Sequence, residues 1–275
     1  MARTTEVMIP NVLSIAGSDP SGGAGIQADL KTFGALGCYG MAAITALTAQ
    51  NTRGVSGVHI PPPAFVGQQI DAIFADVTVH AVKIGMLASP EIIAVVAERL
   101  AHHGAQNIVL DPVLVATSGD SLGGPGVVEA MVRHLFPLAL IVTPNGPEAA
   151  AFLQRPEPRS VGDLEMAARD LQALGAPHVL VKGGHVAGAD AVDALYDGNM
   201  VRLFSAPRVE TRNTHGTGCT LSSAIAAYLA RGFGAGDAVA AAKGYLTQAL
   251  RHSDQLQVGS GHGPVQHFWN RPATP

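Results

Sequence analysis

Short apolar segments alternate with longer amphipathic segments along nearly the whole chain, and this alternation limits the possible folds more than any other feature. Strands are predicted at 12–16, 42–48, 81–84, 107–110, 140–142 and 178–181, and helices at 24–36, 62–74, 90–102, 127–136, 164–174, 220–231 and 238–252. Residues 194–196 and 201–204 flank Asp197-Gly198-Asn199, which is a hairpin signal. Strand and helix in repeated succession predict an α/β fold, with a mostly parallel sheet covered by helices on both faces.

Length and composition suit one domain of this class. The 275 residues are 47% hydrophobic and 14% charged, which provides a large core in a single domain over 1–275. Residues 1–10 are predicted to form a flexible N-terminal extension. A net charge of -4 without a basic run argues against nucleic acid and anionic membranes as partners. We find no signal peptide and no apolar segment of membrane-spanning length, so the sequence predicts a cytoplasmic protein.

Polar and glycine-rich residues follow several of the predicted strands. They are Gly17-Ser18-Asp19, Asp111, Thr143-Pro144-Asn145 and Lys182-Gly183-Gly184. In parallel sheets of this kind, ligands bind outside the carboxyl ends of the strands. These four segments, distant in sequence, are therefore expected to meet at one ligand-binding rim.

The first glycine-rich segment follows the first predicted strand. Residues 23–28 (GAGIQA) match the loose dinucleotide pattern G-x-G-x-x-A, but the next strand region, 42–50, contains no acid to hold a ribose. A dinucleotide oxidoreductase is therefore disfavoured. Five polar or turn-forming residues at 18–22 precede the helix, which favours a ligand-binding loop over a simple tight turn. The chain contains no G-x-x-x-x-G-K-[ST], so it is not a P-loop NTPase.

The second glycine-rich segment, 213–220 (NTHGTGCT), precedes an alanine-rich helix. Gly216 and Gly218 let backbone N–H groups at the helix start point toward an anion, and the helix dipole favours negative charge there. Cys219 stands in the first turn, where a thiolate is expected to be stabilised. The alternative for Cys219 is a small buried residue without a chemical role. The other cysteine, Cys38, forms no C-x-x-C pair with it, which argues against a disulfide framework or a zinc site.

Several motifs carry a family resemblance. Gly216-Thr217-Gly218-Cys219 resembles the anion hole of ribokinase-like kinases, whose usual pattern is Gly-Ala-Gly-Asp, and Asn145-Gly146-Pro147-Glu148 resembles their N-x-x-E motif. More specifically, 16–32 (AGSDPSGGAGIQADLKT), 44–52 (ITALTAQNT), 83–87 (KIGML), 181–185 (VKGGH) and 261–265 (GHGPV) resemble the hydroxymethylpyrimidine/phosphomethylpyrimidine kinases of thiamin biosynthesis. The matches keep their order over about 12–268.

The resemblance implies a fold and an activity. It implies a ribokinase-like three-layer αβα sandwich and a homodimer. It also implies ATP as phosphate donor, Mg²⁺ as cofactor, and a small pyrimidine substrate that is phosphorylated twice. It leaves open whether a monovalent cation assists.

The resemblance also implies roles for individual residues. Gln50 and Asp29 would hydrogen-bond the pyrimidine, with Ala24, Gly17 and Met86 near its ring. Asn145, Lys182, Thr217 and His215 would bind ATP, and Glu148 and Asp111 would hold Mg²⁺. Gly216 and Gly218 would bind the transferring phosphoryl group beside Lys182, and Cys219 would act as the base. The structural alternatives are solvent-facing positions for Gln50 and Asp29, a surface position for Lys182, and a helix-start acid for Glu148.

Two departures and two competing functions complete the prediction. Cysteine replaces the superfamily's aspartate at 219, and Gly146 replaces a more usual leucine, which is expected to loosen the turn before Glu148. Pyridoxal kinase is the alternative enzyme and differs only in its ring contacts. A non-catalytic pyrimidine sensor is the alternative from another class, but the intact anion turn and Lys182 argue against it.

Overall fold

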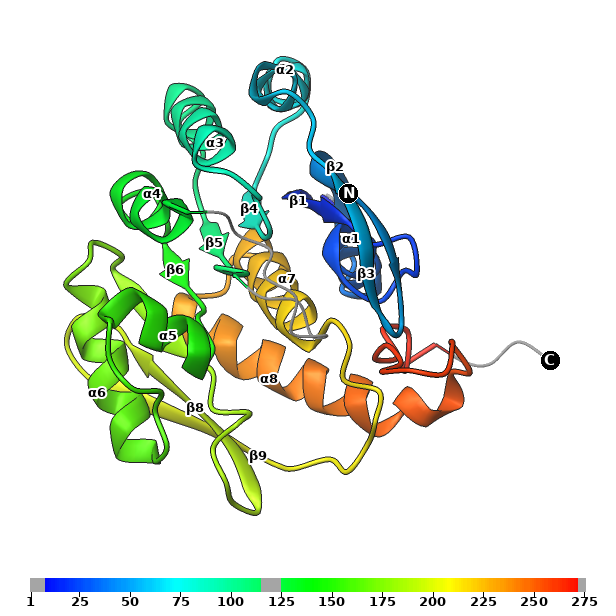
Figure 1. Cartoon of the computed structure of the whole chain (residues 1–275), viewed down its shortest axis with the longest axis vertical. Helices are drawn as coiled ribbons and strands as arrows, with labels where there is room; N and C mark the ends of the chain where they lie inside the picture. The colour runs from blue at the N-terminus through cyan, green and yellow to red at the C-terminus, as the bar shows by residue number, and fades with distance from the viewer. Residues whose placement is uncertain (1–7, 115–124, 272–275) are drawn as a thin grey trace, which may run out of the picture.

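The computed structural model describes residues 8–114 and 125–271 (Figure 1). Its strands are β1 (Asn11–Ser18), β2 (Tyr39–Asn51), β3 (Gly54–His59), β4 (Ala81–Ile84), β5 (Ile108–Leu110), β6 (Ile141–Val142), β7 (His178–Val181), β8 (Asp190–Tyr196) and β9 (Val201–Pro207). Its helices are α1 (Gly25–Ala35), α2 (Pro63–Phe74), α3 (Pro90–His102), α4 (Val127–His134), α5 (Gly146–Leu153), α6 (Val161–Gln172), α7 (Thr217–Ala230) and α8 (Ala235–Arg251), with a short 3₁₀ turn at Ser253–Gln255. The predicted N-terminal extension lies mostly outside the described residues.

The nine described strands form one sheet in the order β3-β2-β1-β4-β5-β6-β7-β8-β9. The pairings from β2 through β1, β4, β5 and β6 to β7 are parallel. The edges are antiparallel, with β3 on β2 at one side and the β8–β9 hairpin on β7 at the other. The sheet is therefore mostly parallel, as predicted, and the hairpin lies where the turn signal placed it.

Helices cover both faces of the sheet, which makes three layers (Figure 1). On one face, α2 to α6 pack on strand residues such as Leu13 and Ile15, and on the other face α1, α7 and α8 pack on residues such as Val12 and Val109. Neighbouring residues of a strand thus contribute to different cores, because side chains alternate across a strand. This arrangement confirms the predicted αβα sandwich. Within the described ranges, no helix has the length and apolar character needed to cross a membrane.

Three local differences from the prediction have physical causes. The strand β3 was not predicted, because this edge strand is mostly exposed and shows little apolar alternation. The eight-residue helix α5 was also not predicted, being too short to show a helical period. Helix α7 begins at Thr217 rather than at the predicted residue 220. Gly218 and Cys219 therefore lie inside its first turn.

Candidate active site

The carboxyl ends of the central strands surround a cavity of about 810 Å³. Its lining includes residues from all four segments predicted to meet there, together with the start of α7. Apart from Asp29, every residue predicted for the site lines this cavity: Gly17, Ala24, Gln50, Met86, Asp111, Asn145, Glu148, Lys182, His215, Gly216, Thr217, Gly218 and Cys219. The cavity is the candidate active site.

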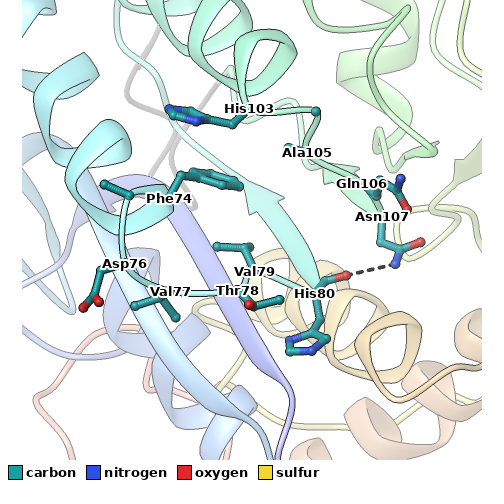
Figure 2. A pocket seen from close by; sticks show the side chains of 12 residues that line it. Phe74, Asp76, Val77, Thr78, Val79, His80, His103, Ala105, Gln106 and Asn107 are labelled. Carbon is teal, nitrogen blue, oxygen red and sulfur yellow. Dashed lines mark hydrogen bonds between the residues drawn. The ribbon is translucent and has the colours of Figure 1, made fainter.

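A second pocket, of about 520 Å³, lies at the opposite end of the sheet. Its lining comes from the segments that lead into β4 and β5, residues 74–80 and 103–107 (Figure 2). The rings of Phe74 and His103 stack there at 4.7 Å, and the Asn107 amide donates to the His80 carbonyl oxygen over 2.9 Å. This pocket contains none of the predicted site residues and lies at the amino ends of parallel strands, where ligands of such sheets do not usually bind.

The start of α7 packs directly against the glycine-rich loop that follows β1. Gly216 has a φ of +78°, and a Cβ atom at this position would lie 1.9 Å from the Gly23 carbonyl oxygen. Only glycine satisfies both requirements, because other residues rarely adopt this backbone conformation and none fits the space. The Thr217 N–H donates to the Thr214 carbonyl oxygen over 3.3 Å. Gly218 and Cys219, whose N–H groups have no acceptor within the helix, line the cavity beside this loop.

Replacing Gly216 by alanine is expected to damage both stability and activity. The left-handed backbone alone costs about 1–3 kcal/mol for a residue with a side chain, and the clash with the Gly23 carbonyl adds to it. Gly232→Ala is the matched control, since Gly232 has a φ of +89° but no atom within 4 Å of a Cβ there. Thermal unfolding and kinase activity would be measured for both. If both substitutions lower stability and activity equally, the contact between Gly216 and the Gly23 carbonyl contributes to neither.

Lys182 lies between two buried carboxylates. Its Nζ is 2.7 Å from Asp111 Oδ1 and 3.9 Å from Glu148 Oε2. Burial opposes the charge on Lys182, but Asp111 and Glu148 raise its pKa above the usual value, so it stays a cation. Burial likewise opposes ionisation of Asp111, yet Lys182 and Lys83 hold the pKa of that carboxyl below its usual range. Lys182 is thus a cation inside the cavity and not a surface lysine.

Glu148 is a helix-start acid, as the structural alternative for this residue predicted. It caps α5 through a reciprocal pair, in which the Asn145 backbone N–H donates to Glu148 Oε2 over 2.8 Å and the Glu148 N–H donates to Asn145 Oδ1 over 2.9 Å. Burial raises the pKa of Glu148 to about 7. The expectation that Gly146 loosens this turn was wrong, because the capping pair closes fully around it.

The residues predicted for Mg²⁺ fit that ion in kind and number. Asp111 and Glu148 lie on either side of Lys182, and the described part of the chain has no cluster of three His, Cys, Asp or Glu side chains able to hold a metal. Mg²⁺ in kinases is bound by one or two carboxylates, with waters and phosphate oxygens completing its shell. The two carboxylates suit such a nucleotide-dependent site.

The expectation of a stabilised thiolate at Cys219 was wrong for the free chain. Burial raises the pKa of Cys219 to about 11, and the nearby Lys83 offsets only part of this effect. Position at a helix start favours a thiolate, but desolvation outweighs it here. Cys219 is therefore a thiol at neutral pH until something changes its surroundings.

Asp29 does not face the cavity. It therefore occupies neither the predicted ring-binding position nor the alternative solvent-facing position. It is fully buried, and Lys83 Nζ lies 2.9 Å from each of its carboxylate oxygens. The hydroxyls of Ser14 and Ser223 donate to it over 2.6 and 2.7 Å. Lys83, Ser14 and Ser223 together occupy both carboxylate oxygens of Asp29, so Asp29 has no acceptor left for a pyrimidine ring.

Lys83 is the residue that the sequence reasoning missed. Burial alone would lower its pKa, but Asp29, with smaller contributions from Cys219 and Asp111, raises it above its usual value. Cys219 and Ser223 are one helical turn apart on α7, and the Ser223 hydroxyl donates to Asp29, so Cys219 lies close to the Lys83–Asp29 pair. The available signal was a lysine inside the apolar strand β4, which needs a buried partner.

His215 was predicted to bind ATP, but its ring faces the other side of the cavity. Its Nε2 lies 2.8 Å from Asp19 Oδ2 and 3.5 Å from Gln50 Nε2. Gln50, Met86, Gly17 and Ala24 belong to the same end of the cavity, around the ends of β1 and β2. His215 therefore belongs with the predicted substrate group and not with the predicted ATP group.

Comparison with known proteins places the chain in a family. The phosphomethylpyrimidine kinase family model matches residues 19–266. The hydroxymethylpyrimidine/phosphomethylpyrimidine kinase of Salmonella typhimurium is 52% identical over 94% of this chain and 97% of its own length.

Solved structures agree on the fold. The phosphomethylpyrimidine kinase from Clostridium difficile is 44% identical, with a TM-score of 0.78 over 88% of this chain and 99% of that chain. The pyridoxal kinase from Staphylococcus aureus, solved with AMP-PCP and pyridoxal, is 36% identical, with a TM-score of 0.88 over 96% of each chain. The family match, the identities and the shared ribokinase-like fold show that the chain is a kinase of the phosphomethylpyrimidine kinase family.

Proposed function

We propose that the chain transfers phosphate from ATP to 4-amino-5-hydroxymethyl-2-methylpyrimidine, and then to its monophosphate, in the formation of thiamin diphosphate. The observation that carries this proposal is the division of one cavity between two chemistries. At one end are Gln50 and Met86, suited to a small ring with donors and acceptors, and at the other are Lys182 and the start of α7, suited to phosphate. The relatives named as kinases of these two pyrimidines support the same substrates.

The proposed reaction uses positioning and charge more than covalent chemistry. The backbone N–H groups at Gly216 to Cys219 bind the transferring phosphoryl group, and Lys182 offsets its charge. The substrate hydroxyl oxygen forms the new bond to phosphorus as the bond from phosphorus to the ADP oxygen breaks. The hydroxyl proton goes to the thiolate of Cys219, which forms once the thiol has lost its own proton to solvent. Mg²⁺, held through Glu148 and Asp111, would supply further neutralisation of the phosphate oxygens. By resemblance, Asn145 and Thr217 contact ATP, and the protein works as a homodimer.

Pyridoxal is the second candidate substrate, and one observation favours it. The structural match to the pyridoxal kinase, with a TM-score of 0.88, is closer than that to the phosphomethylpyrimidine kinase, with 0.78. Sequence identity ranks the two in the opposite order, at 36% and 44%. Residues at the ring decide specificity more directly than backbone shape, so we place the pyrimidine first.

The first test is ATP consumption by the purified protein with Mg²⁺ and one of three acceptors: the hydroxymethylpyrimidine, its monophosphate or pyridoxal. Turnover of both pyrimidines, with pyridoxal weak or inert, is the expected result. Turnover of pyridoxal alone would overturn the substrate assignment and leave the phosphoryl-transfer site in place. No turnover of any acceptor would favour the non-catalytic sensor.

A further inference from the structure

The motif 261–265 (GHGPV) lies outside the lining of the cavity that the described residues form. It belongs to a loop, residues 259–264, which comes after the 3₁₀ turn at Ser253–Gln255 and which we call the C-terminal loop. Figure 1 shows this part of the chain, in red, beside the tip of the β2–β3 hairpin. The C-terminal loop contacts two segments that are distant in sequence and that each lead to one side of the cavity.

The first contact of the C-terminal loop is with Thr52, in the turn between β2 and β3. The Gly261 N–H donates to Thr52 Oγ1 over 3.1 Å, and the His262 N–H donates to the Thr52 carbonyl oxygen over 3.0 Å. Beside them, Arg53 Nε donates to the Ser260 hydroxyl over 2.9 Å. A Cβ atom at Gly261 would lie 2.0 Å from the Thr52 carbonyl oxygen. The loop backbone therefore lies directly on the hairpin turn, an approach that only glycine allows.

The second contact of the C-terminal loop is with the segment that leads into α7. The backbone N–H of His215 donates to the Gly263 carbonyl oxygen over 3.0 Å, and His215 pairs with Pro264 in a parallel β-bridge. A Cβ atom at Gly263 would lie 2.1 Å from Asn213 Oδ1, so the loop also packs closely on Asn213. Because His215 directly precedes Gly216, the C-terminal loop holds the backbone at the start of α7.

The β2–β3 hairpin extends beyond the main sheet at its tip. The pairing of β2 with β1 ends at Leu47, and from there on β2 pairs with β3, the edge strand of the sheet. This pairing is irregular between Ala49 and Gln50, and most of β3 is exposed. A two-stranded hairpin alone is marginally stable. The contacts of the C-terminal loop with Thr52 are therefore expected to decide where the end of the hairpin lies.

We propose that Thr52 and Gly261 are positioning residues, through which the C-terminal loop holds the β2–β3 hairpin in a fixed place relative to the start of α7. The hairpin contributes Gln50 to the cavity lining, and the start of α7 contributes Gly216. In the described part of the chain, Thr52 and Gly261 are not in that lining, so they act through the hairpin and not by contact with a substrate. The effect on catalysis rests on the proposed function, in which the acceptor lies between these two sides of the cavity.

The first test measures the hairpin in the free chain, by hydrogen–deuterium exchange and mass spectrometry. Gly261→Ala places a methyl group against the Thr52 carbonyl oxygen and displaces two hydrogen bonds. Amide exchange in peptides covering 48–56 should therefore become about tenfold faster, while exchange in β1 stays the same. Gly57→Ala is the matched control, because Gly57 lies in the same hairpin but a Cβ atom there meets only Ala49 Cβ at 3.7 Å, an ordinary contact. This control should change neither rate.

Three outcomes of the exchange measurement would overturn the proposal. They are unchanged exchange over 48–56 in Gly261→Ala, an equal increase in Gly57→Ala, and faster exchange throughout the chain with β1 included, which would mean that the loop supports the whole fold. The measurement needs no substrate. Faster exchange confined to the hairpin, in a chain that phosphorylates neither pyrimidine, would count against the proposed function and not against the positioning of the hairpin.

The second test uses a milder substitution and separates positioning from a structural role. Thr52→Val keeps the shape of the side chain but leaves the Gly261 N–H without its acceptor. It is expected to lower kcat/KM for the hydroxymethylpyrimidine about fivefold and to leave the KM for ATP unchanged, because the hairpin carries only the acceptor side of the cavity. Thr52→Ser keeps the hydroxyl and should restore kcat/KM. An unchanged kcat/KM in Thr52→Val, an equal rise in the KM for ATP, or no recovery in Thr52→Ser would overturn the proposal.

Discussion

Cys219→Ala is expected to lower kcat by about 10²- to 10⁴-fold, the range that a general base contributes. The chain gives this prediction a second part, because burial raises the pKa of Cys219 to about 11. Only the thiolate accepts a proton, so activity is proportional to the small ionised fraction at neutral pH. With Mg-ATP saturating, kcat/KM for the pyrimidine should rise about tenfold per pH unit between pH 7 and pH 9.

The control for this experiment is the second cysteine. Cys38 is buried between α1 and α7, with its Sγ 3.7 Å from the Ala227 carbonyl oxygen, and is absent from the cavity lining. Cys38→Ala should keep both the rate and its pH dependence. Cys219→Ala should remain folded by circular dichroism, since a small side chain replaces another. A Cys219→Ala chain with more than a third of the activity, or a rate independent of pH from 7 to 9, would exclude the thiol as the base.

The second large effect concerns stability. Lys83→Met should lower the free energy of unfolding by about 3–5 kcal/mol, because it leaves the carboxylate of Asp29 buried without its cation. The cost comes from the unpaired charge and not from lost packing, since methionine occupies nearly the same volume. The double variant Lys83→Met with Asp29→Asn removes both charges, keeps an acceptor for one of the hydroxyls of Ser14 and Ser223, and gives the other hydroxyl an N–H to accept. It should recover more than half of the loss. Urea unfolding measures all three chains.

Arg155→Ala provides the comparison. Arg155 pairs with Asp170 over 2.6 Å, but both side chains are exposed, at 37% and 51%. Exposed pairs contribute about 0–1 kcal/mol. If Lys83→Met costs no more than Arg155→Ala, or if the double variant is less stable than Lys83→Met alone, the buried pair is not the reason for the loss.

The sequence predicted the sheet, its layers and the rim of the site because these depend on period and order. Asp111, Asn145 and Lys182 each follow a parallel strand, so the fold rule alone places them together. No comparable rule predicts from the sequence which way a side chain points. Asp29 lies on α1 near the loop that follows β1, and only the packing of α1 on α7 shows that its side chain turns inward to Lys83.

Charge states show the same limit. From the sequence, the position of Cys219 at a helix start argues for a lowered thiol pKa, since the dipole is a local effect. Burial, which opposes it, depends on how the surrounding elements close over the cysteine, and no local pattern reports that. His215 differs again. Its neighbours in sequence belong to the glycine turn at the start of α7, yet its ring contacts Asp19 at the other end of the cavity.

The contact between Gly23 and Gly216 also has a consequence for synthesis of the chain. The loop after β1 leaves the ribosome early, but the ring and the turn that fix its shape, at 215 and 216, come more than 190 residues later. Contacts so distant in sequence form late, because the intervening chain must first be ordered. A nascent chain that ends before α7 therefore lacks the glycine turn at 216–219, and its loop after β1 lacks the contacts that residues 215 and 216 make with it. The candidate active site is therefore complete only after α7 has been synthesised and packed against that loop.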